Sequence, residues 1–321
     1  PTACSALRKS GGDDYGGRES RLAAVEVEPM RSRPKLYTSY ATETALFPTT
    51  LQKVMVGLFL VVLVLMPFDL PVINDLPLVR FLGDNSWLRP VNRMLIFAIA
   101  AVGLNLLSGV AGQVSLGHAF FMGVGASTAV LVGGASTSRL WGWGLPMWIW
   151  LPAAGLVAAA VGVLVAPAAV RVRGLYLGIA TIGLVFIGIH LSRVFPEIAG
   201  PPQLGRKWPR LELRFWKEET PLVDFSRKGH WLWFDIGNNQ KTYLLLLGVL
   251  LVLSLVAANL TRSRTGRSWA AIRDRDVAAE IMGVPEFRAK TTAFAISSFY
   301  AGVAGALFAS LSGYMYPEAW N

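Results

Sequence analysis

The sequence predicts an all-α integral membrane protein, a polytopic bundle with about seven transmembrane helices in this chain. The first observation behind this fold class is composition, since 53% of the residues are hydrophobic and only 16% are charged. The second is distribution, because the apolar residues form long blocks, several of which reach the roughly 20 residues needed to cross a hydrocarbon core. Backbone groups inside that core cannot hydrogen-bond to lipid, so each block must be a helix.

Residues 1–50 come before the first block and are expected to form a disordered cytoplasmic segment. Residues 1–29 are rich in Gly, Ser and charge and show no apolar period, and Met30 is a plausible native start. Residues 51–321 form the membrane domain, and we expect the complete protein to continue past Asn321 with further helices. The predicted spans are, in order, Leu51–Phe68, Met94–Leu107, Val114–Val132, Met147–Val170, Leu175–Val194, Thr242–Leu260 and Thr291–Ser312.

The orientation of the spans follows from Lys and Arg, which favour short cytoplasmic loops. The N-terminal flank, the link with Arg171 and Arg173, and the segment 261–290 are all basic, and seven alternating spans put them on one side. This predicts a cytoplasmic N-terminus and an extracytoplasmic loop at 195–241. The tryptophans of that loop are typical either of a docking face for a soluble binding protein or of an interfacial aromatic belt. The net charge of +10 fits this topology and a basic face near anionic lipid, not nucleic-acid binding.

The charged segment Gly266–Lys290 lies between the last two spans and reads as one amphipathic helix. Gly283 permits a helix C-cap, and Pro285 prevents the helix from continuing. A helix held out of the bilayer in this way is usually offered to a soluble partner, although a surface-lying helix without a partner is equally compatible with the composition. Its apolar contacts are assigned to Trp269, Ile272, Val277, Ile281 and Met282, and its charge to Arg273, Asp274, Arg275, Asp276 and Glu280.

A polar, glycine-containing stretch follows the span Met94–Leu107, which is short for a full crossing. Irregular polar backbone at membrane depth is tolerated only inside the protein or beside a watery cavity. A short, glycine-interrupted span is also a pointer to the substrate path of a transporter, and a helix N-terminus exposed there favours a carboxylate. The alternative is that the glycines allow close packing and the polar groups cap helix ends. The candidate path residues are Asn105, Ser108, Gln113, Ser115, Gly117 and His118.

Small residues recur every fourth position in the last span, beginning with Ser297, Ala301 and Gly305. Such a stripe lets another helix approach closely. The sequence leaves open whether that helix belongs to this chain or to a second membrane subunit.

The sequence lacks the motifs of several classes of binding site and enzyme. No Lys follows a Gly, so the chain lacks a phosphate-binding loop and cannot bind ATP through one. Zinc-protease, paired-cysteine and esterase motifs are absent, and we therefore predict no metal, no cofactor and no enzyme activity. Buried carboxylates are scarce, which disfavours a stand-alone secondary transporter.

Three runs of sequence carry a family resemblance. Asn105–Ala126 (NLLSGVAGQVSLGHAFFMGVGA), Arg171–Arg206 and Gly266–Leu307, in this order, resemble the LivM-type permeases of branched-chain amino acid ATP-binding cassette (ABC) importers. The resemblance covers most of the chain from about Met30 onward.

The resemblance implies a permease domain at 51–321, in the inner membrane, that carries branched-chain or related hydrophobic amino acids. Relatives that carry urea or short amides are an alternative. The implied partners are two ABC ATPase subunits that hydrolyse the ATP, a second homologous permease and an extracytoplasmic amino-acid-binding protein. Residues 261–290 would be the cytoplasmic coupling segment, with ATPase coupling assigned to Arg273, Asp274, Asp276, Ala279, Glu280 and Gly283.

Overall fold

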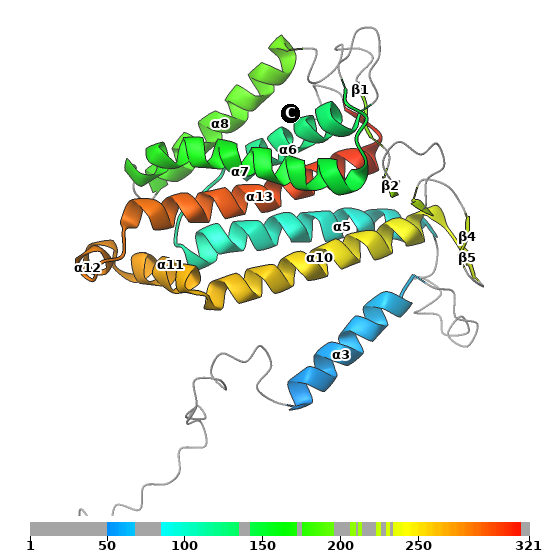
Figure 1. The fold of residues 1–321 in the computed structure, drawn as a ribbon, viewed down its shortest axis with the longest axis horizontal. Coiled ribbons are helices and arrows are strands. Elements are labelled where there is room, and N and C mark those ends of the chain that lie inside the picture. The colour runs from blue at the N-terminus through cyan, green and yellow to red at the C-terminus, as the bar shows by residue number, and fades with distance from the viewer. Residues whose placement is uncertain are drawn as a thin grey trace, which may run out of the picture. The chain divides into compact units, whose positions relative to one another are not determined.

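The computed structural model describes residues 50–67, 85–134, 142–171, 175–195, 206–209, 211–213, 223–225, 229–231 and 234–315 (Figure 1). The expectations for residues 1–49, with the start at Met30, and for the continuation past Asn321 lie outside the described residues. Contacts separate Pro1–Gln52 from Lys53–Asn321, and the elements below belong to the second unit apart from the first three residues of α3.

The described part is built mainly from helices. They are α3 (Thr50–Leu65), α5 (Asn85–Leu104), the π-helix η1 (Asn105–Val110), α6 (His118–Gly133), α7 (Met147–Arg171), α8 (Leu175–Val194), α10 (Asn238–Arg262), α11 (Arg264–Asp274), α12 (Asp276–Ile281) and α13 (Glu286–Ser312). Among the described residues, five helical stretches are long and apolar enough to cross a membrane, and α3 and α6 are shorter apolar helices. Each of the seven predicted blocks therefore corresponds to a helix, and the predicted fold class is confirmed.

Short antiparallel strand pairs accompany the helices, most of them within the loop predicted at 195–241. They are β1 (Arg206–Lys207) with β6 (Tyr314–Met315), β2 (Glu212–Leu213) with β3 (Val223–Asp224), and β4 (Gly229–Trp231) with β5 (Phe234–Ile236). The first pair joins this loop to the end of α13, which the sequence pattern did not indicate.

The prediction that Met94–Leu107 is a short span was wrong. Helix α5 begins at Asn85 and runs without interruption into η1, so that the apolar stretch Trp87–Val110 has 24 residues. Arg89, Pro90 and Arg93 precede the predicted apolar span and occupy the first turns of the helix. Pro90 lies in the second turn, where it removes one backbone hydrogen bond without ending the helix, and arginine heads at a span end can reach the membrane interface.

Helix α13 lies at the centre of the bundle and packs against α5, α6 and α7 (Figure 1). In its apolar window 67% of the residues are buried, against 17% for α8. Close approach is possible because small residues meet: a Cβ added at Gly125 would overlap Gly302, and one added at Gly305 would overlap the carbonyl of Met122. The small-residue stripe of the last span thus packs within this chain.

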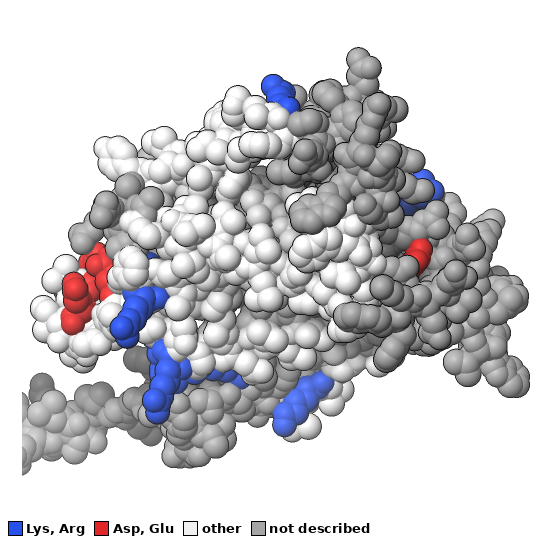
Figure 2. Space-filling model, turned by 45° about the horizontal axis from the view of Figure 1, so that its top comes forward, with Lys and Arg blue, Asp and Glu red and all other residues white. Residues whose placement is uncertain are grey.

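Helix α10 packs along α5 and holds α3 at its first turns. Tyr243 donates a hydrogen bond to the Leu63 carbonyl at 3.0 Å, and Gln240 donates one to the Pro67 carbonyl at 2.7 Å. On the face shown in Figure 2 most of the described surface is uncharged, and most of the acidic side chains in view gather at the end that carries α11 and α12. A largely uncharged surface of this kind is the pattern of a protein surrounded by lipid.

Candidate functional site

The predicted path segment begins with a π-helix. In η1 the amide of Ala111 donates to the carbonyl of Leu106 at 3.1 Å, five residues back. The chain then turns at Gly112, whose φ of 68° lies in the left-handed region that glycine adopts without strain. Residues 113–117 are non-helical, and α6 begins only at His118. Irregular backbone between two apolar helices was predicted here, and π-helical turns occur frequently at functional sites.

Gln113 and Ser115 face the protein interior, whereas Val114 and Leu116 between them are exposed. Gln113 is 5% exposed and Ser115 is 6% exposed. Among the described residues, neither the side-chain nitrogen nor the side-chain oxygen of Gln113 has a hydrogen-bond partner, and the Ser115 hydroxyl has none either. A buried polar group without a partner costs about 1–3 kcal/mol, so these side chains are not explained by packing alone.

Gly117 and His118 fix the end of the segment to two other helices. The backbone of Gly117 lies against Thr181 of α8, and the amide of Leu116 donates to the Thr181 hydroxyl at 2.9 Å. His118 donates from Nε2 to the carbonyl of Ala100 in α5 at 3.1 Å. Thr181 was not predicted as a site residue, and its only sequence signal was a hydroxyl within an apolar span.

Asn105 and Ser108 lie apart from the buried pair. Both are exposed, and Ser108 donates to the Leu104 carbonyl of its own helix at 2.8 Å. The Asn105 amide lies over Gly109 one turn later. The structure thus brings Gln113, Ser115, Gly117 and His118 into the bundle and leaves Asn105 and Ser108 on the surface of its described part.

A cavity of about 390 Å³ begins directly after this segment, between α6 and α8. Ala119 and Phe120 of the first turn of α6 line it together with aliphatic residues of both helices. The hydroxyls of Ser127 and Ser192 in its wall donate to carbonyls of their own helices, which leaves the cavity apolar.

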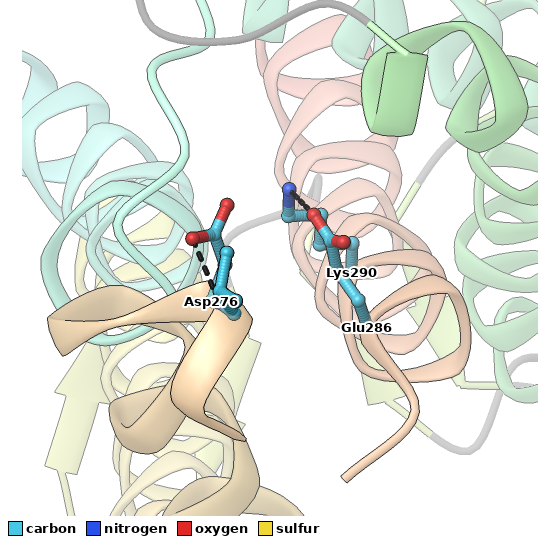
Figure 3. Close-up of polar contacts among 4 residues, drawn as sticks. Asp276, Glu286 and Lys290 are labelled. Carbon is cyan, nitrogen blue, oxygen red and sulfur yellow. Dashed lines mark hydrogen bonds and ion pairs between the residues drawn. The ribbon is translucent and has the colours of Figure 1, made fainter. Parts of the chain in front are cut away.

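The expected single amphipathic helix is two helices. The first of the two, α11, begins at Arg264, where the Ser263 hydroxyl accepts a hydrogen bond from the Gly266 amide at 3.4 Å. The helical run then breaks at Arg275, whose backbone is extended. Asp276 then starts α12, where its carboxylate accepts from the Val277 amide at 2.9 Å (Figure 3). Carboxylates bond the backbone at helix N-termini, and this competes with a continuous helix.

The predicted cap at Gly283 is confirmed. Its φ is 86°, its amide donates to the Glu280 carbonyl at 2.9 Å, and the Val284 amide donates to the Ala279 carbonyl at 2.9 Å. This is the Schellman arrangement that ends helices at glycine. Glu286 and Lys290 form an ion pair on the first turns of α13 (Figure 3).

Helix α11 is docked on the bundle. Trp269 and Ile272 are buried, and Trp269 donates to the Thr292 hydroxyl of α13 at 3.2 Å. Arg273 donates from Nη1 to the carbonyl of Gly109 in η1, and a Cβ added at Gly112 would lie 2.8 Å from the Cγ of Arg273. The predicted coupling segment therefore touches the predicted path segment directly.

Helix α12, in contrast, presents apolar residues to the outside. Val277 is 59% exposed, Ile281 83% and Met282 84%, so of the five residues predicted to supply apolar contacts only Trp269 and Ile272 are buried in the described part of the chain. Of the other predicted coupling residues, Asp274, Glu280 and Gly283 are exposed, Asp276 is half-buried and Ala279 is buried. No group of three His, Cys, Asp or Glu side chains within the described residues could hold a metal ion.

A family model described as branched-chain amino acid transport system, permease component, matches residues 88–320. The chain is 35% identical to the high-affinity branched-chain amino acid transport system permease protein LivM of Escherichia coli (strain K12) over 236 residues, which are 71% of this chain and 53% of that protein. It is 36% identical to the LivM protein of Salmonella typhimurium (strain LT2) with the same coverage.

The chain thus spans about half the length of the curated relatives that it matches. No solved structure matches it significantly. The family match covers the path segment, both helices of the coupling segment and α13. The chain is a multi-pass membrane component rather than an enzyme, and it belongs to the family of permease components of branched-chain amino acid transport systems.

Proposed function

We propose that this chain forms the translocation path of an ABC importer for branched-chain or related hydrophobic amino acids. It would lie in the inner membrane with its N-terminus in the cytoplasm, and two ATPase subunits, a second homologous permease and an extracytoplasmic amino-acid-binding protein would complete the system. Family membership and the names of the relatives support the kind of transport. The observation that carries the mechanism is the contact between Arg273 and Gly109.

The exposed face of α12 supports an ATPase as the partner of the coupling segment. Three large apolar side chains, Val277, Ile281 and Met282, stand beside the exposed carboxylate of Glu280. Burying apolar surface contributes about 25 cal/mol per Å², so a protein groove that covers these side chains would bind favourably. Gly283 ends α12, and this limits the length of the exposed apolar surface.

Movement of the ATPases would reach the path through α11. This helix is fixed to α13 by Trp269, and Arg273 binds the last turn of η1. A tilt of α11 would therefore pull the carbonyl of Gly109 and press on Gly112, and the non-helical residues 113–117 would follow. Rigid-body alternation around a fixed site is the usual transport cycle of such proteins.

The substrate would contact Gln113 and Ser115. Their unpaired amide and hydroxyl groups offer donors and acceptors for the charged head of an amino acid, and the apolar cavity between α6 and α8 suits an aliphatic side chain. Both side chains are uncharged, which also favours the second candidate, a permease for urea or short amides. A stand-alone secondary transporter would need no ATPase and would not use α12.

Recovery of the ATPase with the complete protein in mild detergent tests the coupling role. Two double variants should lose both the bound ATPase and ATP-dependent leucine uptake. One is Glu280→Ala/Gly283→Val, and the other is Val277→Asp/Ile281→Asp. Ala270→Asp, on the exposed side of the docked helix α11, is the matched control and should retain both. Equal recovery of the ATPase from all variants would contradict the coupling role of α12. Competition of urea with leucine uptake would favour the second candidate.

A further inference from the structure

A second cavity, of about 410 Å³, lies at the end of the bundle opposite α11 and α12. It is enclosed by the start of α5, the start of α10 and the end of α13. Because α11 follows the other end of α10 and α12 precedes the other end of α13, a full span separates the two regions (Figure 1). In the proposed topology this cavity is extracytoplasmic. We call it the arginine cavity after Arg89 and Arg93, which line it.

The two arginines lie one helical turn apart on α5 and have exposed side chains. Within the part of the chain that the structure describes, no carboxylate lines the cavity and neither guanidinium has an ion-pair partner. Two like charges at this spacing repel each other. An oxyanion placed between them would offset the repulsion and accept hydrogen bonds from both guanidinium groups.

Other groups in the wall fit the rest of an amino acid. The Asn238 side-chain oxygen and the Ser310 hydroxyl are buried atoms without a partner among the described residues. Asn238 also begins the 25-residue helix α10, whose N-terminal amides carry partial positive charge. Leu211, Phe225 and Leu311 supply apolar surface in the same wall.

The helix segment that carries the arginines is fixed by a buried neighbour. Asn92 lies between them on α5, is fully buried and donates from Nδ2 to the carbonyl of Asn239 in α10 at 3.2 Å. This bond fixes the start of α5 against the start of α10, where both arginines line the cavity. A fixed backbone at both helix starts lowers the entropy cost of binding there.

We propose that the arginine cavity binds the carboxylate of a zwitterionic amino acid at the outer end of the path, with Arg89 and Arg93 as its donors and the Asn238 oxygen as an acceptor for its ammonium group. The inference rests on the proposed function for the identity of the ligand. A lipid phosphate offers the same oxyanion chemistry, and the experiment separates the two sources.

The test measures thermal stabilisation of the purified complete protein in mild detergent by four probes: leucine, 4-methylpentanoate, leucinamide and a short-chain phosphatidylglycerol. Leucine and 4-methylpentanoate should raise the Tm, and leucinamide, which lacks the carboxylate, should not. In the double variant Arg89→Gln/Arg93→Gln the leucine concentration for half of the shift should rise at least about 10-fold, because two charge-assisted bonds are lost. Arg89→Lys/Arg93→Lys should retain part of the affinity, and Arg288→Gln, at the other end of the bundle, should behave as the parent.

Stabilisation by the phosphatidylglycerol alone would assign the arginines to lipid and overturn the proposal. Equal shifts by leucine and leucinamide, or a leucine shift that the double variant preserves, would also overturn it. If the double variant does not fold, Arg89→Gln and Arg93→Gln separately carry the test with smaller shifts. The assay needs neither ATPase nor uptake, so its failure leaves the coupling assignment intact, and loss of coupling leaves the binding result intact.

Discussion

Arg273 of α11 donates a hydrogen bond to the backbone carbonyl of Gly109 in η1, across 164 positions of the sequence. The last turn of a helix leaves carbonyls without intrahelical partners, and a cation there is favoured by the helix dipole. One side chain therefore satisfies the end of the π-helix and connects the coupling segment with the path segment.

Replacing Arg273 by Ala should uncouple transport without releasing the ATPase. The apolar face of α12 stays intact, so ATPase recovery should match the parent, while ATP-dependent leucine uptake should fall about 10-fold or more for the loss of a charge-assisted bond. Arg273→Lys should keep part of the uptake. Arg275→Ala, an exposed arginine at the helix break, is the control and should transport normally. Normal uptake by Arg273→Ala would remove this residue from the mechanism.

Gly112→Ala should impair transport for two separable reasons. A left-handed φ costs a residue with a side chain about 1–2 kcal/mol, and the new methyl group would press on the Cγ of Arg273. The double variant with Arg273→Ala should recover the steric part of the stability loss, so the two changes should not be additive in thermal unfolding. Gly183→Ala meets open space and serves as the control. Strict additivity would argue against the contact.

Gln113→Leu and Ser115→Ala should separate stability from transport. Because each removes buried polar atoms that lack partners in the described structure, each should leave the Tm unchanged or raise it, by up to the equivalent of about 1–3 kcal/mol. Leucine uptake should nevertheless fall, since the substrate would lose these contacts. Unfolding curves and uptake on the same preparations decide the matter, and unchanged uptake would return both residues to a packing role.

Gly305→Ala should destabilise the bundle, because its Cβ would overlap the backbone of Met122 in α6. Overpacking of this kind costs about 1–3 kcal/mol. Gly248→Ala on α10, where a Cβ would meet nothing within 4 Å, should be neutral or slightly stabilising. Thermal unfolding in one detergent compares the two, and equal melting temperatures would contradict the central position of α13.

The features that depend on local sequence were predictable. The seven apolar blocks became helices, Gly283 ended α12, and the polar stretch after Leu107 is irregular. The start of α5 was missed because Arg89 and Pro90 look like loop residues when the neighbouring helices are unknown. The break at Arg275 depends on a side-chain bond of Asp276, which competes with the amphipathic period that suggested one helix.

The partners of the site residues could not be predicted from one sequence. Arg273 was assigned to coupling, but its contact with Gly109 depends on how α10 and α13 carry α11 back to the end of α5. Thr181 and the arginine cavity likewise arise from elements that are distant along the chain. No local pattern records such distances.

The central position of α13 also bears on how the protein is made. Ribosomes deliver α5, α6 and α7 to the membrane before α13, yet each of them packs against it. Until it arrives, Gly125 of α6 lacks Gly302, the backbone neighbour that it later touches. The earlier helices therefore enter the lipid with faces that α13 covers only later, although α6 and α7 already pack against each other. A substitution that disrupts α13 would then lower the yield of assembled protein, because three helices depend on it for their packing.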